Sequence, residues 1–274
     1  MKVVGVLLRI EWLKTVKRRA FWVAGGAFAV FTAIPAVEGV RGARRNPNLS
    51  YALPESWPDI LGAATGIGPF FAGVLMILLV APEFTWRTAR QNVIDGLSKE
   101  RFYAGKVMLL AGLVLLFIAT AVLIGVGGTL LSPSEGGLGI LRPTDLSYMG
   151  GLALSLLLVG SAGLMLSVLI RSSGPALGIL FLYLIVEEAV GGLISRAGGA
   201  LRRSAEYFPF SILDQLGDDL AHYPEVLADV NAERTERGLE SWEFLDVEVL
   251  AVAALAYSAI FLGLAFLSMR KRDL

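Results

Sequence analysis

The chain has 274 residues, of which 55% are hydrophobic and 18% charged, and its mean hydropathy is +0.66. This composition excludes an ordinary soluble globular domain and indicates a membrane protein. The chain contains no cysteine and one histidine, so disulfides, thiolate chemistry and Cys/His metal clusters are excluded. Basic and acidic residues number 24 each; this balance alone says nothing of nucleic acid, and we expect no such partner.

Apolar runs of about 20 residues, the length that crosses ~30 Å of hydrocarbon, predict six transmembrane helices. In chain order they cover residues 20–39, 60–82, 104–130, 148–170, 175–195 and 247–269. We therefore predict an all-α membrane protein in which residues 1–274 form a single transmembrane domain.

The distribution of lysine and arginine predicts the orientation. With both termini in the cytoplasm, 15 of these residues lie inside and nine outside, and five of the nine fall in one long loop that counts weakly in the positive-inside rule. We therefore expect a multi-pass protein of the plasma (inner) membrane with cytoplasmic N and C termini.

Residues 1–19 mix apolar side chains with lysine and arginine, as expected for an interfacial helix on the anionic inner leaflet. Glu11 falls within the apolar arc of this helix and lowers its amphipathicity. No clear small-x-small cleavage site follows the next apolar run, so we predict a retained helix instead of a signal peptide.

Small residues recur within the predicted spans: Gly62, Gly66, Gly68, Gly125, Gly127, Gly128, Gly160 and Gly163. Because they lack bulk, they let helix backbones approach closely where lipid supplies no hydrophobic drive for association. We interpret them as packing positions. Pro69 is expected to kink the second span because it removes a backbone donor.

The polar stretch at residues 83–106 is longer than a turn between two spans requires. We expect Thr85 to cap a short helix and Gly96 to end it in a left-handed turn. Its apolar anchors would be Val93, Ile94 and Leu97. Ser98 is predicted to cap the third span, with Glu100 in its first turn. The result is a short cytoplasmic helix attached to two spans and suited to docking.

Glu187 and Glu188 lie within the fifth span, where a carboxylate at mid-bilayer costs about 2.5–3.5 kcal/mol. At 1.5 Å per residue Glu187 lies about 18 Å along the helix, past the midplane and toward the outer side. Two interpretations stay open: a cation or proton site facing a cavity, or a pair reached by water or neutralised by Arg196. The first would suit a self-contained secondary transporter or channel. A glutamate protease is excluded because position 192 is Gly192.

Residues 196–246 form the longest non-spanning segment and are predicted to be external and helical. Residues 211–220 and 224–238 read as short helices, the second beginning at Pro224 and ending at Gly238. We interpret the segment as a cap over the outer mouth, with a solvated loop as the alternative.

The chain carries no nucleotide-binding loop. Gly105-Lys106 is preceded by Glu100, where a G-x-x-x-x-G-K loop needs glycine. We therefore expect no cofactor and no ATP hydrolysis in this chain.

Between spans two and three the chain carries a set of residues at fixed spacing: Glu83, Thr88, Arg90, Ser98, Lys99, Gly105 and Lys106. This pattern resembles the signature of permease subunits of type-two ABC transporters, which typically show Glu, three residues, Gly-Thr, one residue and Arg, followed by Ser-Arg and Gly-Lys. Here Arg87 replaces the glycine and Lys99 the second arginine. The N-terminal "RIEWLKTVKRRAFW", the six spans and "YFPF" before the last span are similar to the same family.

The resemblance implies the membrane subunit of an ABC exporter, in which two permeases form the pore as a homodimer or heterodimer. Two separate ATPase subunits would bind ATP and Mg beneath them. The family's coupling helix falls on about Thr85 to Asp95, within a coupling region at 84–99. The implied ATPase-coupling residues are Glu83, Arg87, Thr88, Arg90, Val93, Ile94, Asp95 and Lys99, with Val93 and Ile94 seated in a groove of the ATPase. Apolar span faces favour an amphipathic cargo.

Overall fold

The computed structural model describes residues 2–46, 49, 51–53, 56–94, 96–133, 143–197, 204–221, 231–238 and 246–272. Its helices are α1 (Lys2–Val16), α2 (Arg19–Arg45), α3 (Trp57–Thr85), α4 (Thr88–Ile94), α5 (Lys99–Leu131), α6 (Pro143–Ile170), α7 (Ser173–Ala197), α9 (Pro209–Ala221) and α11 (Val247–Lys271). The described residues contain no strand, and the all-α class is confirmed.

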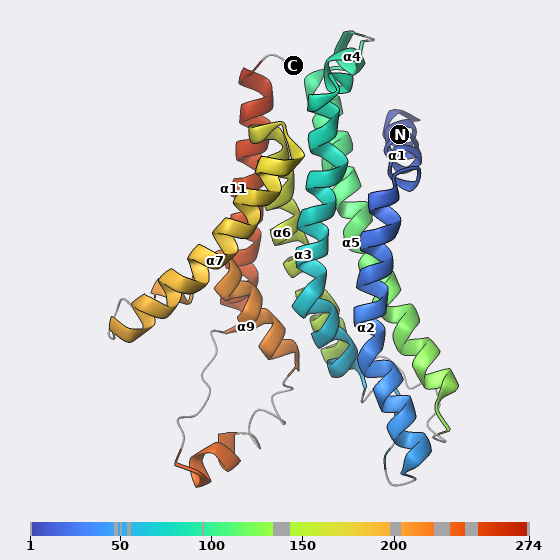
Figure 1. Cartoon of the computed structure of the whole chain (residues 1–274), viewed down its shortest axis with the longest axis vertical. Coiled ribbons are helices and arrows are strands. Elements are labelled where there is room, and N and C mark those ends of the chain that lie inside the picture. Colours follow the sequence, from blue (N-terminus) through green and yellow to red (C-terminus); the bar gives the residue numbers. More distant parts are fainter. Residues whose placement is uncertain are drawn as a thin grey trace.

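The six predicted spans are confirmed. Six helices are long and apolar enough to cross a membrane, namely α2, α3, α5, the 148–170 part of α6, the 173–194 part of α7, and α11. Helix α4, helix α1 and the C-terminal end of the chain lie at one end of this bundle, which we call the α4 end (Figure 1). Helix α9 lies toward the opposite end, the α9 end.

Helix α3 lies at the centre of the bundle and packs closely against α6, because both helices have glycines at their contact. A Cβ built on Gly163 of α6 would overlap the carbonyl oxygen of Gly73 in α3 and lie 3.0 Å from its Cα. The packing interpretation also holds for other predicted glycines, which lie against a neighbouring side chain: Gly68, Gly125, Gly128 and Gly160. It does not hold for Gly66 and Gly127, beside which a Cβ would meet nothing within 4 Å.

Helix α7 runs obliquely away from the other spans (Figure 1). Only 11% of its most apolar 18-residue stretch is buried within the protein. Helix α9 instead packs its apolar face against the bundle. Ile212 and Leu216 of α9 form a buried cluster with Leu158 of α6 and with Leu250 and Ala254 of α11. The segment between the last two spans therefore covers part of the bundle.

Within that segment, α9 begins two residues before the predicted 211–220 helix and ends one residue after it. A further helix is present at residues 231–236, and Gly238 follows it with a φ of +71°. This left-handed conformation agrees with the predicted end of the second helix. Its predicted start at Pro224 lies outside the described residues.

Candidate functional site

Helix α4 projects from the α4 end with one face anchored and the other exposed. Ala89 is 1% exposed and belongs to the main apolar core, whereas Ile94 on the same short helix is 67% exposed. The Thr88 hydroxyl donates a hydrogen bond to the Glu83 carbonyl oxygen, 3.1 Å away, and so fixes the start of α4 to the end of α3. Arg90 is exposed. An apolar and a basic side chain thus face outward from a fixed base.

The start of α4 differs from the prediction. Thr85 does not cap α4, because it is the last residue of α3 and its hydroxyl donates to the carbonyl oxygens of Ala81 and Arg171, at 3.4 and 3.0 Å. The chain turns at Arg87 instead, which has a φ of +57°. This is the position where the resembling signature has glycine, and the left-handed backbone gives the physical reason for that glycine.

The end of the α4 segment agrees with the prediction. Gly96 has a φ of +98°, and the Ser98 hydroxyl accepts a hydrogen bond of 3.2 Å from the Arg101 amide, which confirms both the turn and the cap of α5. The Lys99 ammonium group donates to the Arg272 carbonyl oxygen, 3.0 Å away, at the end of α11. The Val93 side chain and Asp95 lie outside the described residues.

A cluster of four charged side chains, three of them buried, lies beneath α4. The ammonium group of Lys106, in α5, is 2.7 Å from a carboxylate oxygen of Glu11 in α1 and 2.7 Å from one of Glu83 in α3. Lys106 is 1% and Glu83 3% exposed. The Lys14 ammonium group lies 3.6 and 3.8 Å from the same two carboxylates. Two positive and two negative charges therefore join three helices, and we call these four residues the ion cluster.

Placing Glu83 in the ion cluster changes its expected role. The sequence grouped it with residues at an ATPase interface, but its carboxylate points into the protein and takes part in internal ion pairs. Glu11, which lowered the amphipathicity of the N-terminal helix, is likewise buried. An acidic residue in an apolar arc and a lysine inside an apolar span are the two sequence signals for this pairing, and neither by itself identifies the other as its partner.

A second contact holds α2 against the end of α3. The Arg18 guanidinium donates hydrogen bonds to the carbonyl oxygens of Leu78 and Leu79, both at 2.9 Å. Pro82 lies four residues after Leu78 and has no amide hydrogen, so the Leu78 carbonyl lacks its helical partner. Arg18 supplies the missing donor. The same guanidinium lies 5.6 Å from the centre of the Trp86 ring, next to the turn into α4.

These contacts make the α4 end a single connected unit. The ion cluster joins α1, α3 and α5, Arg18 joins the start of α2 to α3, and Thr85 joins α3 to the end of α6. The end of α3, from which the chain turns into α4, is therefore tied by side-chain contacts to α1, α2, α5 and α6.

The intramembrane glutamates lie far from α4, and the structure gives Glu187 a partner. One carboxylate oxygen of Glu187 accepts hydrogen bonds from the amides of Phe210 and Ser211, at 2.7 and 3.0 Å, in the first turn of α9. A carboxylate is stabilised there because the unpaired amides and the helix dipole both favour negative charge. Glu188 is exposed. The Arg196 side chain, which was considered as a neutralising group, lies outside the described residues.

The comparisons with known proteins agree with this architecture. Residues 7–187 match a family described as ABC-2 family transporter protein. A comparison with curated proteins gives no match. The matched range covers more than half of the chain and runs from α1, through the ion cluster and α4, to Glu187 in α7. The chain therefore belongs to the ABC-2 type transporter permease family and is a membrane subunit of a transporter.

Proposed function

We propose that this chain is the permease subunit of an ATP-driven exporter and that α4 is its docking element for a separate ATPase subunit. The observation that carries this proposal is the outward presentation of Ile94 and Arg90 on a helix whose other face is buried at Ala89. An exposed apolar side chain beside a cation suits a protein partner, since a buried apolar anchor supplies affinity while a charge at the rim sets register and association rate.

The contacts beneath α4 support a mechanical role. When the ATPase subunits close on ATP and Mg, they would push α4, which is fixed to α3 by Thr88. The ion cluster would pass the movement to α1 and α5, since its separation would leave charges buried without partners, a costly state. The membrane helices would then move as a group and change access to the translocation path.

The assembly implied by this mechanism contains two ATPase copies and a second permease, either identical or different. The α4 end would face the cytoplasm, where ATP is present, and both termini would share that side in the plasma membrane. This orientation places 15 of the 24 lysine and arginine residues in the cytoplasm. The excess supports it, because cytoplasmic loops of membrane proteins are enriched in these residues.

The test is co-purification of the chain with a candidate ATPase subunit, sought by its Walker motif among the neighbouring genes, followed by measurement of ATP turnover. Ile94→Asp and Arg90→Glu should each lower recovery of the ATPase at least tenfold, about 1.4 kcal/mol or more of binding free energy. Matched controls lie at the other end of the bundle: Leu49→Asp replaces another exposed apolar residue and Arg41→Glu another exposed arginine. Unchanged recovery with the α4 variants would overturn the docking assignment.

A self-contained secondary transporter using Glu187 and Glu188 is the competing function. This alternative predicts that the chain alone transports its substrate down or against an ion gradient. Neutralising both glutamates should then abolish this flux. The family assignment favours the ATP-driven alternative, and flux that requires ATP and is lost in Ile94→Asp would decide for it.

A further inference from the structure

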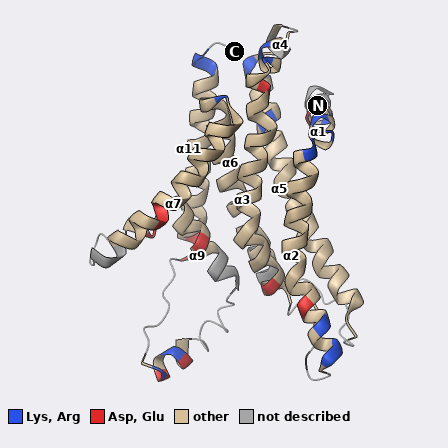
Figure 2. Ribbon diagram, in the orientation of Figure 1, with Lys and Arg blue, Asp and Glu red and all other residues tan. Residues whose placement is uncertain are grey.

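An acidic cavity lies between α3, α7 and α9, far from α4. Its volume is about 940 Å³, and the described residues that line it include four carboxylates and no lysine or arginine. The carboxylates belong to Glu187, Glu188, Glu206 and Asp214. Figure 2 shows acidic residues on α7 and α9, whereas basic residues gather at the α4 end. The cavity is therefore a region of negative potential.

The Glu187 carboxylate carries a negative charge that no cation of the described residues pairs with. The residue is 6% exposed, and one of its carboxylate oxygens is held by the first turn of α9. The other oxygen, Oε2, is buried, and the described part of the chain offers this carboxylate only one further contact, from the Tyr183 hydroxyl one turn earlier on α7. Such an atom is costly to leave unsatisfied, more so when it carries charge. Because Glu187 lines the cavity, a positively charged ligand would satisfy it.

The cavity does not suit a bare metal ion. Within the described residues, no group of three or more His, Cys, Asp or Glu side chains is placed to hold a metal. Instead, the carboxylates are spread around a large space whose lining also includes Phe70, Leu184 and Phe210. This combination suits an organic cation, whose diffuse charge is met by dispersed carboxylates and whose carbon atoms are met by apolar side chains.

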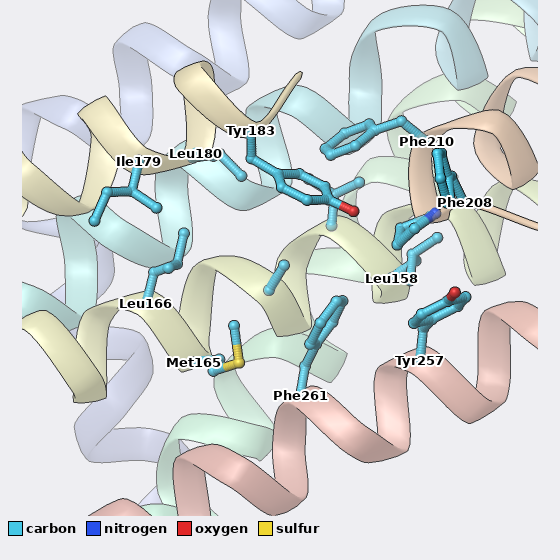
Figure 3. Close-up of a pocket in the computed structure, with 13 residues that line it drawn as sticks. Leu158, Met165, Leu166, Ile179, Leu180, Tyr183, Phe208, Phe210, Tyr257 and Phe261 are labelled. Carbon is cyan, nitrogen blue, oxygen red and sulfur yellow. The ribbon is translucent and has the colours of Figure 1, made fainter. Parts of the chain in front are cut away.

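An apolar cavity adjoins the acidic one. Its volume is about 480 Å³, and its lining comes from α6, α7, α11 and the start of α9, including Tyr183, Phe210 and Phe261 (Figure 3). Phe210 lines both cavities. The rings of Phe210 and Tyr183 lie 5.6 Å apart, and Tyr183 is one helical turn before Glu187 on α7. The acidic and the apolar cavity therefore meet at Phe210, beside the ring of Tyr183.

We propose that the two cavities form one binding site for a lipophilic organic cation. The cationic centre lies among the carboxylates of Glu187, Glu188 and Glu206, and the bulky apolar part occupies the aromatic cavity beyond Phe210. The proposal rests on the proposed function only in making this ligand the cargo class of the exporter. Binding itself requires neither the ATPase nor ATP.

The test compares tetraphenylphosphonium with tetraphenylborate, two ions of nearly equal shape and opposite charge. Binding of each is measured by equilibrium dialysis against the purified chain in lipid nanodiscs, with empty nanodiscs subtracted. The chain should bind the phosphonium at least tenfold more tightly. Glu188→Gln combined with Glu206→Gln, which leaves the Glu187–α9 contact intact, should weaken phosphonium binding by about fivefold per carboxylate, the upper range for partly exposed ion pairs.

A control makes the same change of net charge away from the site, by combining Glu233→Gln with Glu236→Gln on the 231–236 helix. It should leave phosphonium binding unchanged. For the apolar part, Ala162→Phe fills the aromatic cavity and should weaken tetraphenylphosphonium binding while leaving tetramethylammonium binding as it was. Equal affinity for the two tetraphenyl ions, or no effect of the paired Glu188 and Glu206 changes, overturns the proposal.

The outcomes separate this site from the docking role of α4. Ile94→Asp should leave tetraphenylphosphonium binding unchanged, because α4 lies at the other end of the bundle. Failure of cation binding with intact ATPase recovery would therefore remove the cargo class alone, and the reverse result would remove only the coupling assignment.

Discussion

The Lys106 ammonium group lies 2.7 Å from a carboxylate oxygen of Glu83, and this contact joins the first turns of α5 to the last turn of α3. The pair is almost completely buried, and Glu11 supplies a second carboxylate at the same distance from Lys106. Because two acidic groups depend on one buried cation, the three positions are energetically coupled.

Replacement of Lys106 tests this coupling. Lys106→Met should destabilise the chain by about 3–5 kcal/mol, because it leaves two carboxylates buried with only the more distant Lys14. Adding Glu11→Gln and Glu83→Gln to Lys106→Met should recover a large part of the loss, since neutral amides cost less to bury. The measurement is thermal unfolding followed by the fluorescence of the five tryptophans.

The control for this experiment is Lys99→Met. It removes a lysine from the same helix, and the ammonium group of this lysine bonds to a backbone carbonyl at the surface. Its effect should stay within about 0.5 kcal/mol. Equal losses of stability from Lys99→Met and Lys106→Met would show that the ion cluster does not stabilise the fold more than an exposed lysine does.

The contact between Arg18 and the carbonyl of Leu78 depends on a proline, which gives a double-mutant test. Arg18→Ala should cost about 1–3 kcal/mol because the Leu78 carbonyl loses its donor. In a Pro82→Ala background, residue 82 regains an amide that can bond to Leu78, so the same Arg18→Ala change should cost less. Thermal unfolding of the four proteins in the cycle gives the coupling energy. Additive effects of the two changes would contradict the substitution of a side-chain donor for a backbone donor.

The sequence predicted those features that depend on neighbours along the chain. The six spans follow from the lengths of their apolar runs, and the Ser98 cap and the Gly96 turn follow from local backbone chemistry. The start of α4 was predicted at Thr85, but it lies at Thr88, because the Thr85 hydroxyl bonds to the carbonyl of Arg171, which is 86 residues away.

Features that depend on distant pairing were not predictable in the same way. Glu11 and Lys106 are 95 residues apart, and only the packing of α1 against α5 brings them together. Likewise, the first turn of α9 reaches Glu187 across 23 residues, which turns a costly intramembrane carboxylate into a helix-terminal acceptor. The apolar surroundings of Glu11 and Glu187 in the sequence mark both as unusual positions for a carboxylate. Hydropathy carries no information about the partners of these two residues.

Close packing of α3 against α6 depends on the absence of a side chain at Gly163. Gly163→Ala should destabilise the chain by about 1–3 kcal/mol, because the added methyl overlaps the Gly73 backbone, which cannot move away as a flexible side chain would. Gly150→Ala on the same helix is the matched control, since a Cβ there meets nothing within 4 Å. It should be neutral or stabilise the helix by up to about 1 kcal/mol. Thermal unfolding separates the two, and equal effects would show that α3 and α6 are less closely packed than described.

The left-handed backbone at Arg87 makes an unusual prediction, that removal of a charged side chain strengthens the local structure. Arg87→Gly should stabilise the turn into α4 by about 0.5–1 kcal/mol, because glycine adopts a φ near +57° without the penalty of about 1–2 kcal/mol that other residues bear. Slower hydrogen exchange of the α4 amides would report this gain, since local opening controls their exchange.

Arg90→Gly is the matched control, because it makes the same chemical change within the helical part of α4. It should speed exchange by lowering helix stability by about 1 kcal/mol. Gly96→Ala should also speed exchange, since alanine is strained at the φ of +98° that Gly96 adopts. If Arg87→Gly speeds exchange as Arg90→Gly does, the contacts of the arginine side chain outweigh its backbone strain. The glycine of the related signature would then serve something other than the shape of this turn.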